Sequence, residues 1–185
     1  MTKERMKFKE MCCSLILLIM LSTLTSCVEK KREFPTGCDV KDLLLGLSDL
    51  PEGSYTSSSG EPIPDSTINS AGSSFYINSR LVSHANYWYS LEKYSIRKYE
   101  KEITAAKLIN ADNQPMPTEI TINSLIADDF EIECGDDVLA FRCIYVGRYK
   151  NYVTVLNSEI AEDALSFAAY QKIIKVLDER MFSCE

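Results

Sequence analysis

The sequence predicts an α+β domain in which an antiparallel sheet of about five strands carries two main helices packed on one face. Short runs of alternating or aromatic residues, bounded by turn signals, indicate strands at residues 74–78, 86–94, 130–134, 138–146 and 153–156. Two longer segments, 96–110 and 166–182, repeat apolar residues at the three-and-four spacing of a helix face. Because these elements do not alternate as βαβ units, a parallel doubly wound sheet is disfavoured.

The part of the chain before the first predicted strand has little regular structure. Residues 39–46 predict a short helix, with Asp39 as its N-cap and Gly46 at its end. Residues 51–72 are dense in Ser, Gly and Pro and contain few large apolar side chains, so they predict a loop. A loop of this length is uncommon inside a compact domain.

The second predicted strand contains an aromatic cluster, Tyr87, Trp88 and Tyr89. Side chains of a strand alternate between two faces, and Leu91 indicates which face is buried. We therefore expect Tyr87 and Tyr89 to face the helices and Trp88 to face solvent, unless residues 51–72 cover it. Because Tyr and Trp provide rigid contact area at binding surfaces, these three are the candidate binding residues. The alternative is that they are ordinary half-buried residues of the sheet.

Each predicted helix has a serine where an N-cap is expected, Ser95 before the first and Ser166 before the second. The apolar face of the first helix contains Ile96, Tyr99, Ile103 and Ala106. That of the second contains Phe167, Tyr170, Ile174, Leu177 and Met181. Charged residues occupy the opposite sides, so each helix should lie on the sheet with its charges in water.

The run of strands from residue 130 onward predicts an antiparallel meander. If Asp136-Asp137 forms a two-residue turn, Cys134 lies opposite Leu139, and Glu131 lies opposite Arg142 on the other face. In that register the hydrophobic pattern and the charges agree.

A second turn of the meander is predicted at Lys150-Asn151, which places Tyr149 beside Tyr152. Asparagine is common where a hairpin turn needs a positive φ, whereas lysine is a poor residue for it. The position of this turn is therefore less well defined by the sequence than the strands on either side.

The chain begins with a targeting signal. Basic residues precede an apolar run from Met11 to Leu21, and small polar residues follow it, as in the three regions of a signal peptide. The run is shorter than the roughly 20 residues that span a bilayer. A cytosolic amphipathic helix is disfavoured because polar residues do not interrupt the run at helical spacing.

The end of this signal, Leu24-Thr25-Ser26-Cys27, resembles the lipobox of bacterial lipoprotein precursors. The resemblance implies a lipid thioether on Cys27 with acyl chains such as palmitate, removal of residues 1–26, and display outside the cytoplasm at the cell membrane or outer envelope. Residues 27–37 would then be a lipidated tether, and residues 38–185 a single α+β domain. A plain secretory signal is the alternative, but it needs no cysteine at this position.

Four cysteines, Cys38, Cys134, Cys143 and Cys184, remain after the predicted lipidation site. An even number in an oxidising compartment predicts two disulfides. In the register above, Cys134 and Cys143 are displaced by roughly 13 Å along the sheet, whereas bridged Cα atoms lie within about 7 Å. We therefore expect each of them to bond Cys38 or Cys184.

The composition disfavours several function classes. The chain has a net charge of −7, and removal of the basic signal makes the remainder more acidic, so nucleic acid is not an expected partner. No glycine-rich phosphate motif is present, and no cofactor is expected. No metal site is expected either, because the four cysteines lack C-x₂-C spacing and the sole histidine, His84, is far from them in sequence. The basic cluster Lys30-Lys31-Arg32 can touch anionic head groups, or it is simply a solvated tether.

By elimination, we expect a lipid-anchored extracytoplasmic binding or accessory module without catalysis, held to the membrane through Cys27 and binding an unknown protein or glycan. One alternative is an extracytoplasmic hydrolase that uses His84 with a serine such as Ser83 or Ser90, although no G-x-S-x-G motif supports it. Another is a carrier for a hydrophobic ligand between sheet and helices, which would need an apolar cavity of several hundred Å³.

The lipobox leads to a first prediction. Cys27→Ser should leave an unprocessed precursor, because the thioether must form before lipoprotein-type cleavage, whereas a plain secretory signal would tolerate the change. Detergent phase partitioning of the wild-type mature chain measures whether the chain carries the lipid. Recovery of that chain in the aqueous phase would contradict the lipobox interpretation.

Overall fold

The computed structural model describes residues 38–62, 69–110, 124, 126–137 and 140–182. The predicted signal, the tether and Cys184 lie outside these residues. The strands are β1 (Tyr55–Pro62), β2 (Asn69–Ile77), β3 (Arg80–Trp88), β4 (Asp129–Asp137), β5 (Ala140–Tyr149) and β6 (Tyr152–Glu159). The helices are α2 (Glu92–Lys107) and α3 (Phe167–Phe182), with short 3₁₀ helices η1 (Leu47–Asp49) and η2 (Leu108–Asn110). Within the described part of the chain, no helix combines the length and apolar character needed to cross a membrane.

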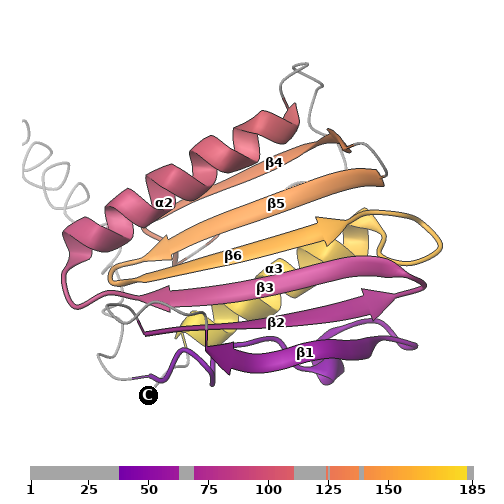
Figure 1. Ribbon diagram of the computed structural model, residues 1–185, viewed down its shortest axis with the longest axis horizontal. Helices are drawn as coiled ribbons and strands as arrows, with labels where there is room; N and C mark the ends of the chain where they lie inside the picture. Colours follow the sequence, from indigo (N-terminus) through magenta and orange to yellow (C-terminus); the bar gives the residue numbers. More distant parts are fainter. Residues whose placement is uncertain (1–37, 63–68, 111–123, 125, 138–139, 183–185) are drawn as a thin grey trace, which may run out of the picture. The chain divides into compact units, whose positions relative to one another are not determined.

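All described strands form one antiparallel sheet in the order β1-β2-β3-β6-β5-β4 (Figure 1). The order arises because two three-stranded meanders join through their last strands, β3 and β6. Each meander is followed by a helix of 16 residues. The predicted α+β class is confirmed, and the sheet has six strands rather than about five.

The additional strand, β1, lies within residues 51–72, so the prediction of a loop there is wrong. β1 pairs with β2 at the edge of the sheet, and its register shifts between Thr56 and Ser58 and again between Ser59 and Glu61. Edge strands are often polar and interrupted by bulges, which discourages pairing with another chain. Such a strand lacks the apolar alternation by which strands are recognised in a sequence.

The two helices pack against opposite faces of the sheet, so the prediction that both lie on one face is wrong. In Figure 1, α2 lies in front of β4 and β5, and α3 lies behind the sheet. The reason is that β5 and β6 carry apolar residues on both faces: Tyr145 and Leu156 contact the α3 side, and Val146 and Val153 contact the α2 side. A strand that is apolar on both faces requires cover on both.

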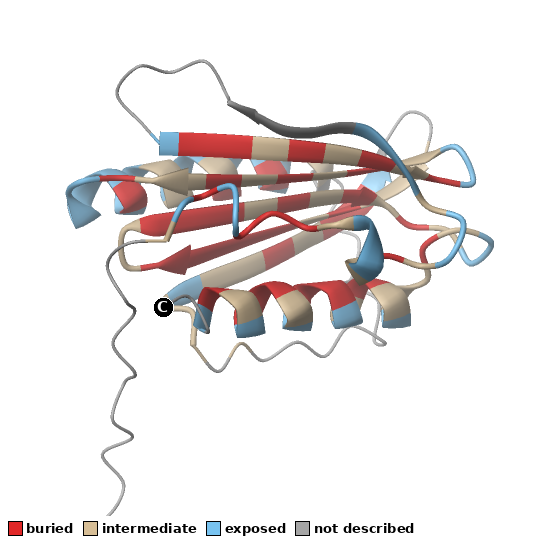
Figure 2. Cartoon of the chain, turned by 90° about the horizontal axis from the view of Figure 1, so that it is seen from below, coloured by how far each residue is buried: buried red, intermediate tan, exposed pale blue. Residues whose placement is uncertain are grey.

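The main core lies between the sheet and α3, whose buried residues lie on the side of the helix that faces the strands (Figure 2). Tyr170, Ile173, Ile174, Leu177 and Met181 of α3 are all at most 2% exposed. The predicted cap is confirmed, because the Ser166 hydroxyl accepts a hydrogen bond from the Ala169 backbone N–H at 3.3 Å.

Helix α2 begins earlier than predicted. β3 ends at Trp88 and the helix starts at Glu92, so Ser95 is a buried helical residue and not the N-cap. Its hydroxyl is close to two carbonyl oxygens, that of Glu92 at 2.8 Å and that of Lys150. Leu91, expected to mark the core, is 51% exposed because it precedes the helix instead of lying in a strand.

In the segment before the sheet, residues 38–50, a turn replaces the helix that was predicted at residues 39–46, and η1 follows it. Asp39 caps only this turn, by accepting a hydrogen bond from the Lys41 backbone N–H at 3.0 Å. The apolar residues of the segment pack with Tyr149, Tyr152 and Met181 on the α3 side of the sheet. Tertiary contacts therefore decide its conformation over local helix propensity.

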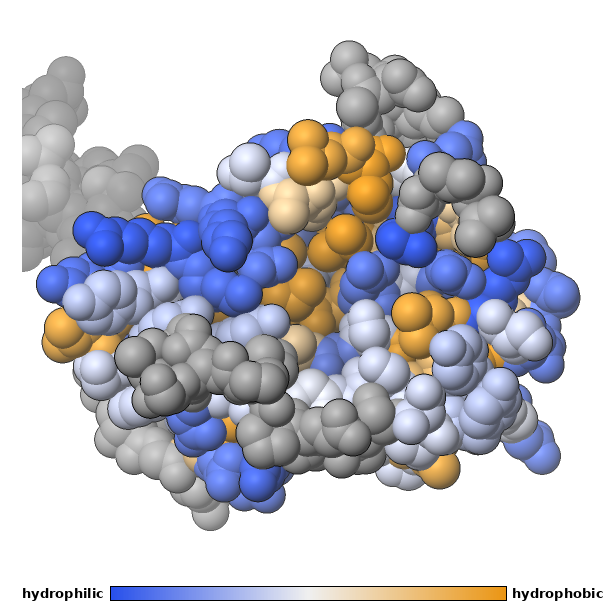
Figure 3. Space-filling view, viewed as in Figure 1, coloured by the Kyte–Doolittle hydropathy of each residue, from blue (hydrophilic) through white to orange (hydrophobic). Residues whose placement is uncertain are grey.

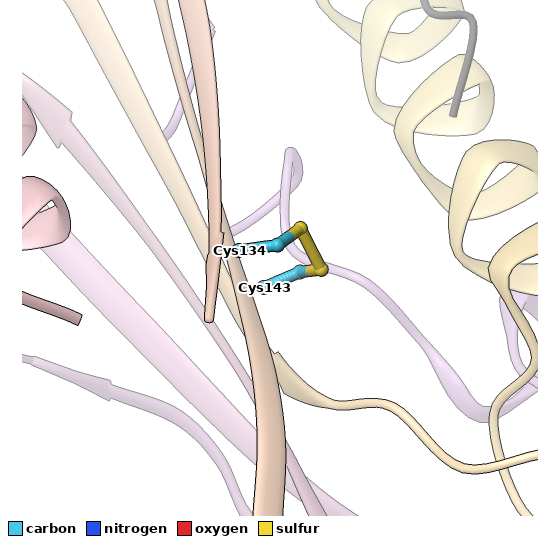
Figure 4. Close-up of a disulfide and its surroundings, with 2 residues drawn as sticks. All are labelled: Cys134 and Cys143. Atoms are coloured by element: carbon cyan, nitrogen blue, oxygen red, sulfur yellow. A yellow bond between two sulfur atoms is a disulfide. The ribbon is translucent and has the colours of Figure 1, made fainter. Parts of the chain in front are cut away.

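The register of the β4–β5 hairpin differs from the prediction, and it brings Cys134 directly opposite Cys143. The two form a disulfide with a Cα–Cα distance of 4.1 Å, and Figure 4 shows both side chains projecting toward α3. The prediction that they would not bond each other is therefore wrong. Cys38 is also disulfide-bonded.

The physical reason is that β4 continues through Asp137, so the two strands join across residues 138–139, which lie outside the described residues. The observed and predicted registers differ by an even number of residues. Both therefore leave the same side chains on the same face, and the hydrophobic pattern does not distinguish them.

The second predicted turn is confirmed, since Tyr149 lies opposite Tyr152 and Lys150 has a φ of 52°. Hydrogen bonds from neighbouring elements stabilise the turn despite the positive φ, which is unfavourable for lysine. Asp128 Oδ2 accepts a hydrogen bond from the Lys150 N–H at 2.6 Å, and the Tyr89 N–H donates to the Asn151 carbonyl at 2.9 Å.

The core leads to a second prediction. Gly147 lies under the rings of Tyr145 and Tyr149, and an added Cβ would be 2.5 Å from Tyr145 Oη and 2.9 Å from the Tyr149 ring. Because both rings are fully buried, they have no room to move, and Gly147→Ala should lower the free energy of unfolding by about 1–3 kcal/mol in denaturant titration. Gly46→Ala is the matched control, because its Cβ would lie 3.7 Å from the nearest atom. Equal losses in the two variants would contradict the steric argument.

Candidate binding surface

A strip of half-buried apolar residues lies on the α2 side of the sheet. It consists of Tyr87 from β3, Tyr99 from α2, Ile144 from β5 and Val155 from β6, which we call the apolar strip. Figure 3 shows an apolar area over the strands on this face, beside the hydrophilic side chains of α2. The strip is therefore the uncovered margin of a core cluster.

Strand periodicity and register place these residues together. Val153 and Val155 share one face of β6, and they lie opposite Tyr87 of β3 and Val146 of β5, respectively. Val146 and Val153 are fully buried, with Ile103 of α2 packed against them. The helix covers completely only the residues directly beneath it, because Tyr87, Ile144 and Val155 beside it keep part of their surface in water.

An ionic cluster around Arg148 fixes the start of α2 over β5. The Arg148 guanidinium donates to Asp129 Oδ2 from Nε at 2.8 Å and from Nη2 at 2.6 Å, and to Glu92 Oε1 from Nη1 at 3.0 Å. Asp128 lies 3.6 Å from the same guanidinium. Arg148 is 8% exposed, whereas the side chains of Glu92 and Asp129 are 56% and 51% exposed, so only the guanidinium of these ion pairs is shielded from water. The cluster positions α2 and thereby sets how much of the sheet it covers.

Charged side chains of α2 border the strip. Lys98 Nζ lies 3.8 Å from the centroid of the Tyr87 ring and 2.6 Å from Glu102 Oε1. At the other end of the helix, Lys107 pairs with Glu131 of β4 at 2.7 Å. An apolar centre with a charged border is the usual arrangement of a protein-binding surface.

Both tyrosines of the strip are hydrogen-bond donors at neutral pH. Burial, together with the nearby Glu102 carboxylate, raises the pKa of Tyr87 to about 12. Burial and the Glu131 and Asp129 carboxylates raise the pKa of Tyr99 to about 12 as well, although Arg148 opposes the rise. The strip thus combines aliphatic surface with two neutral hydroxyl groups.

The three predicted aromatic residues separate in the structure. Tyr87 faces α2, as expected. Trp88 is half-buried on the opposite face, where it packs against the cluster formed by residues 40–44 and their neighbours. The expectation that Trp88 faces solvent is therefore wrong, because the segment before the sheet covers it. Tyr89 is buried and does not belong to the strip.

His84 is fully enclosed on the α3 side of the sheet. Its Nδ1 accepts a hydrogen bond from the Leu45 N–H at 3.1 Å, so Nε2 carries the proton and donates to Thr154 Oγ1 at 2.7 Å. Burial, with a contribution from Arg180, lowers the pKa of His84 to about 3. Ser83 points to the other face of β3, and Ser90 is exposed beyond its end, so the structure brings neither to the imidazole.

The aliphatic members of the strip, Ile144 and Val155, are not apparent as surface residues from the sequence. The signal that could have found them is the continuous apolar run in β5 and β6, which indicates two covered faces. No group of three or more His, Cys, Asp or Glu side chains in the described ranges is placed to hold a metal ion.

Comparisons with protein-family models, with curated proteins and with solved structures gave no match to this chain.

The environment of His84 leads to a third prediction. Its folded pKa of about 3 lies below the ordinary value of 6.5, so the unfolded chain binds a proton that the folded chain does not. Stability should therefore be complete above pH 6.5 and fall by about 1.4 kcal/mol per pH unit below it. Urea titrations at pH 7.5 and 5.5 measure this, with His84→Gln as the control, since His84 is the only histidine. The same pH dependence in both proteins would contradict this assignment.

Proposed function

We propose that this chain is a lipid-anchored module that binds a protein partner outside the cytoplasm and catalyses no reaction. The resemblance of residues 24–27 to a lipobox supports the anchor and the compartment. The apolar strip supports binding, because it is a partly exposed aromatic and aliphatic surface bordered by charges.

The single observation that carries the proposal is the incomplete cover of the sheet by α2. Val146 and Val153 are fully buried beneath the helix, whereas Ile144 and Val155 are only partly buried. Covering aliphatic side chains of this kind is favourable by about 25 cal/mol per Å² of apolar surface removed from water. A partner that extends the cover of α2 would gain this energy.

A protein partner fits the strip better than a glycan. Sugars bind aromatic rings by stacking on a ring face, and Lys98 Nζ lies over the Tyr87 ring at 3.8 Å. The other strip residues on the sheet, Ile144 and Val155, are aliphatic and offer no ring. The interaction therefore resembles the packing of an apolar side chain against a sheet.

The two alternative functions have less support. A hydrolase would need an accessible His84 beside a serine, but both ring nitrogens are engaged and the ring is 1% exposed. A carrier would need a cavity between sheet and helices. The space beside α3 is occupied by large, fully buried side chains, including Tyr145, Tyr170 and Leu156.

A photo-crosslinking experiment gives the fourth prediction. The full chain carries a photoreactive phenylalanine analogue at Val155, or at Lys172 on the exposed side of α3 as the control. We expect a discrete crosslinked protein from position 155 only, and its loss when Ile144→Gln is added to the same chain. Thermal unfolding of the Ile144→Gln variant verifies that it remains folded.

The outcome that would contradict the proposal is equally specific. Identical crosslinked products from positions 155 and 172, or none from position 155, would show that the strip is not a binding surface. Products that persist in the folded Ile144→Gln variant would lead to the same conclusion.

A further inference from the structure

A second exposed surface lies at the start of α2. Leu91, Tyr94 and Ile96 are 51%, 40% and 39% exposed. Two cations lie over the Tyr94 ring, Lys93 Nζ at 5.0 Å and Arg97 Cζ at 5.9 Å from its centroid. We call these five residues the α2 tip. It combines apolar side chains, an aromatic ring and positive charge, and it is separate from the apolar strip.

The α2 tip is locally cationic in an acidic chain. Residues 91–101 contain four Lys or Arg and two Glu residues, whereas the whole chain has a net charge of −7. Lys93 and Arg97 of the tip are cationic, whereas the neighbouring Glu92 is hydrogen-bonded at 3.0 Å to Arg148, a guanidinium that Asp128 and Asp129 also contact. Lys98 is paired with Glu102 on the flank of the helix. The charge of the tip therefore complements an anionic surface.

The α2 tip and Cys38, the first described residue, are both linked to one hairpin of the sheet. The β5–β6 hairpin contacts both: its Tyr152 hydroxyl donates to the Cys38 carbonyl at 3.0 Å, and its Lys150 carbonyl accepts from the Ser95 hydroxyl. Figure 1 shows α2 beginning at this end. Cys38 and the α2 tip therefore lie at the same end of the sheet, Cys38 on its α3 side and the tip on its α2 side.

We propose that the α2 tip docks on anionic lipid head groups of the membrane that holds the lipidated Cys27. This inference rests on the lipid anchor of the proposed function. About 11 residues separate Cys27 from Cys38, and at roughly 3.6 Å per residue they keep the domain within about 40 Å of the bilayer.

At this separation docking becomes an intramolecular step, so a weak contact suffices to orient the domain. The side chains of the tip suit that contact, because basic residues are attracted to anionic head groups and tyrosine rings favour the membrane interface. The basic cluster Lys30-Lys31-Arg32 of the predicted tether would be attracted to the same surface.

Fluorescence of the full lipidated chain in vesicles tests the proposal and gives the fifth prediction. Trp88 is the only tryptophan, so Tyr94→Trp in a Trp88→Phe background places the signal at the tip. The vesicles contain phosphatidylcholine alone, or phosphatidylcholine and phosphatidylglycerol at about three to one, which makes the surface anionic. Brominated acyl chains then quench a tryptophan that reaches the interface. We expect quenching and a blue shift in the anionic vesicles only.

Neutralising the tip provides the matched comparison. Lys93→Gln with Arg97→Gln should lower the ratio of docked to free domain by about 30-fold, which corresponds to about 2 kcal/mol. Lys172→Gln with Lys175→Gln removes the same charge from the exposed side of α3, on the other face of the sheet, and should leave quenching unchanged. All four lysine and arginine side chains are exposed, so these changes do not disturb the core.

Co-sedimentation with the vesicles separates the two proposals. A chain that sediments with both kinds of vesicle but shows no quenching at position 94 retains its anchor and overturns the docking. Equal quenching in neutral and anionic vesicles, or equal loss in the two double variants, also overturns it. A chain that sediments with neither kind of vesicle overturns the anchor itself, and the docking with it.

Discussion

The structure depends on one constraint, that the central strands β5 and β6 are apolar on both faces. Tyr145 and Leu156 face one side of the sheet, and Val146 and Val153 face the other, all with no exposed surface. A sheet of this kind is stable only if both faces are removed from water. The helix that follows each meander provides this cover, α3 on one side and α2 on the other. Among the elements that the structure describes, α2 alone covers its side, so that cover is partial and leaves the apolar strip partly exposed.

Buried polar groups then join the segment before the sheet to this frame. His84 accepts the Leu45 N–H, and Arg180 of α3 donates to the Leu44 carbonyl and holds Asp49 with Nη2–O distances of 2.8 and 2.9 Å. An unpaired polar group in such a site would cost about 1–3 kcal/mol, so these hydrogen bonds favour one placement of the segment. The same segment covers Trp88, and its first described residue, Cys38, bonds to Tyr152.

The spacing of apolar residues in the sequence indicates which side chains are buried, but it does not indicate strand register or the placement of helices over the sheet. Periodicity identified α3 with its Ser166 cap, because this helix buries one clear face, and the apolar runs at residues 138–146 and 153–156 identified β5 and β6. It did not identify β1, whose residues are mostly polar, nor the Cys134–Cys143 pair, because registers that differ by an even number of residues bury the same side chains. Of the candidate site, Tyr87 was found from composition. The rest of the strip depends on how far α2 extends over the sheet, which is a tertiary property that local sequence does not encode.

The position of α2 links the two surfaces on which the proposals rest. Its inner side completes a core cluster through Ile103, and its flank leaves the apolar strip open beside it. Arg148 fixes its start to β5 and β4 through Glu92 and Asp129, close to the hairpin that also bonds Cys38. An anchored chain whose helix start contacts lipid would hold the sheet in a defined orientation, with the strip displayed along the side of the domain rather than against the bilayer. The docking of the tip and the binding of a partner use different residues, because the tip lies at the start of α2 and the strip lies mainly on β3, β5 and β6.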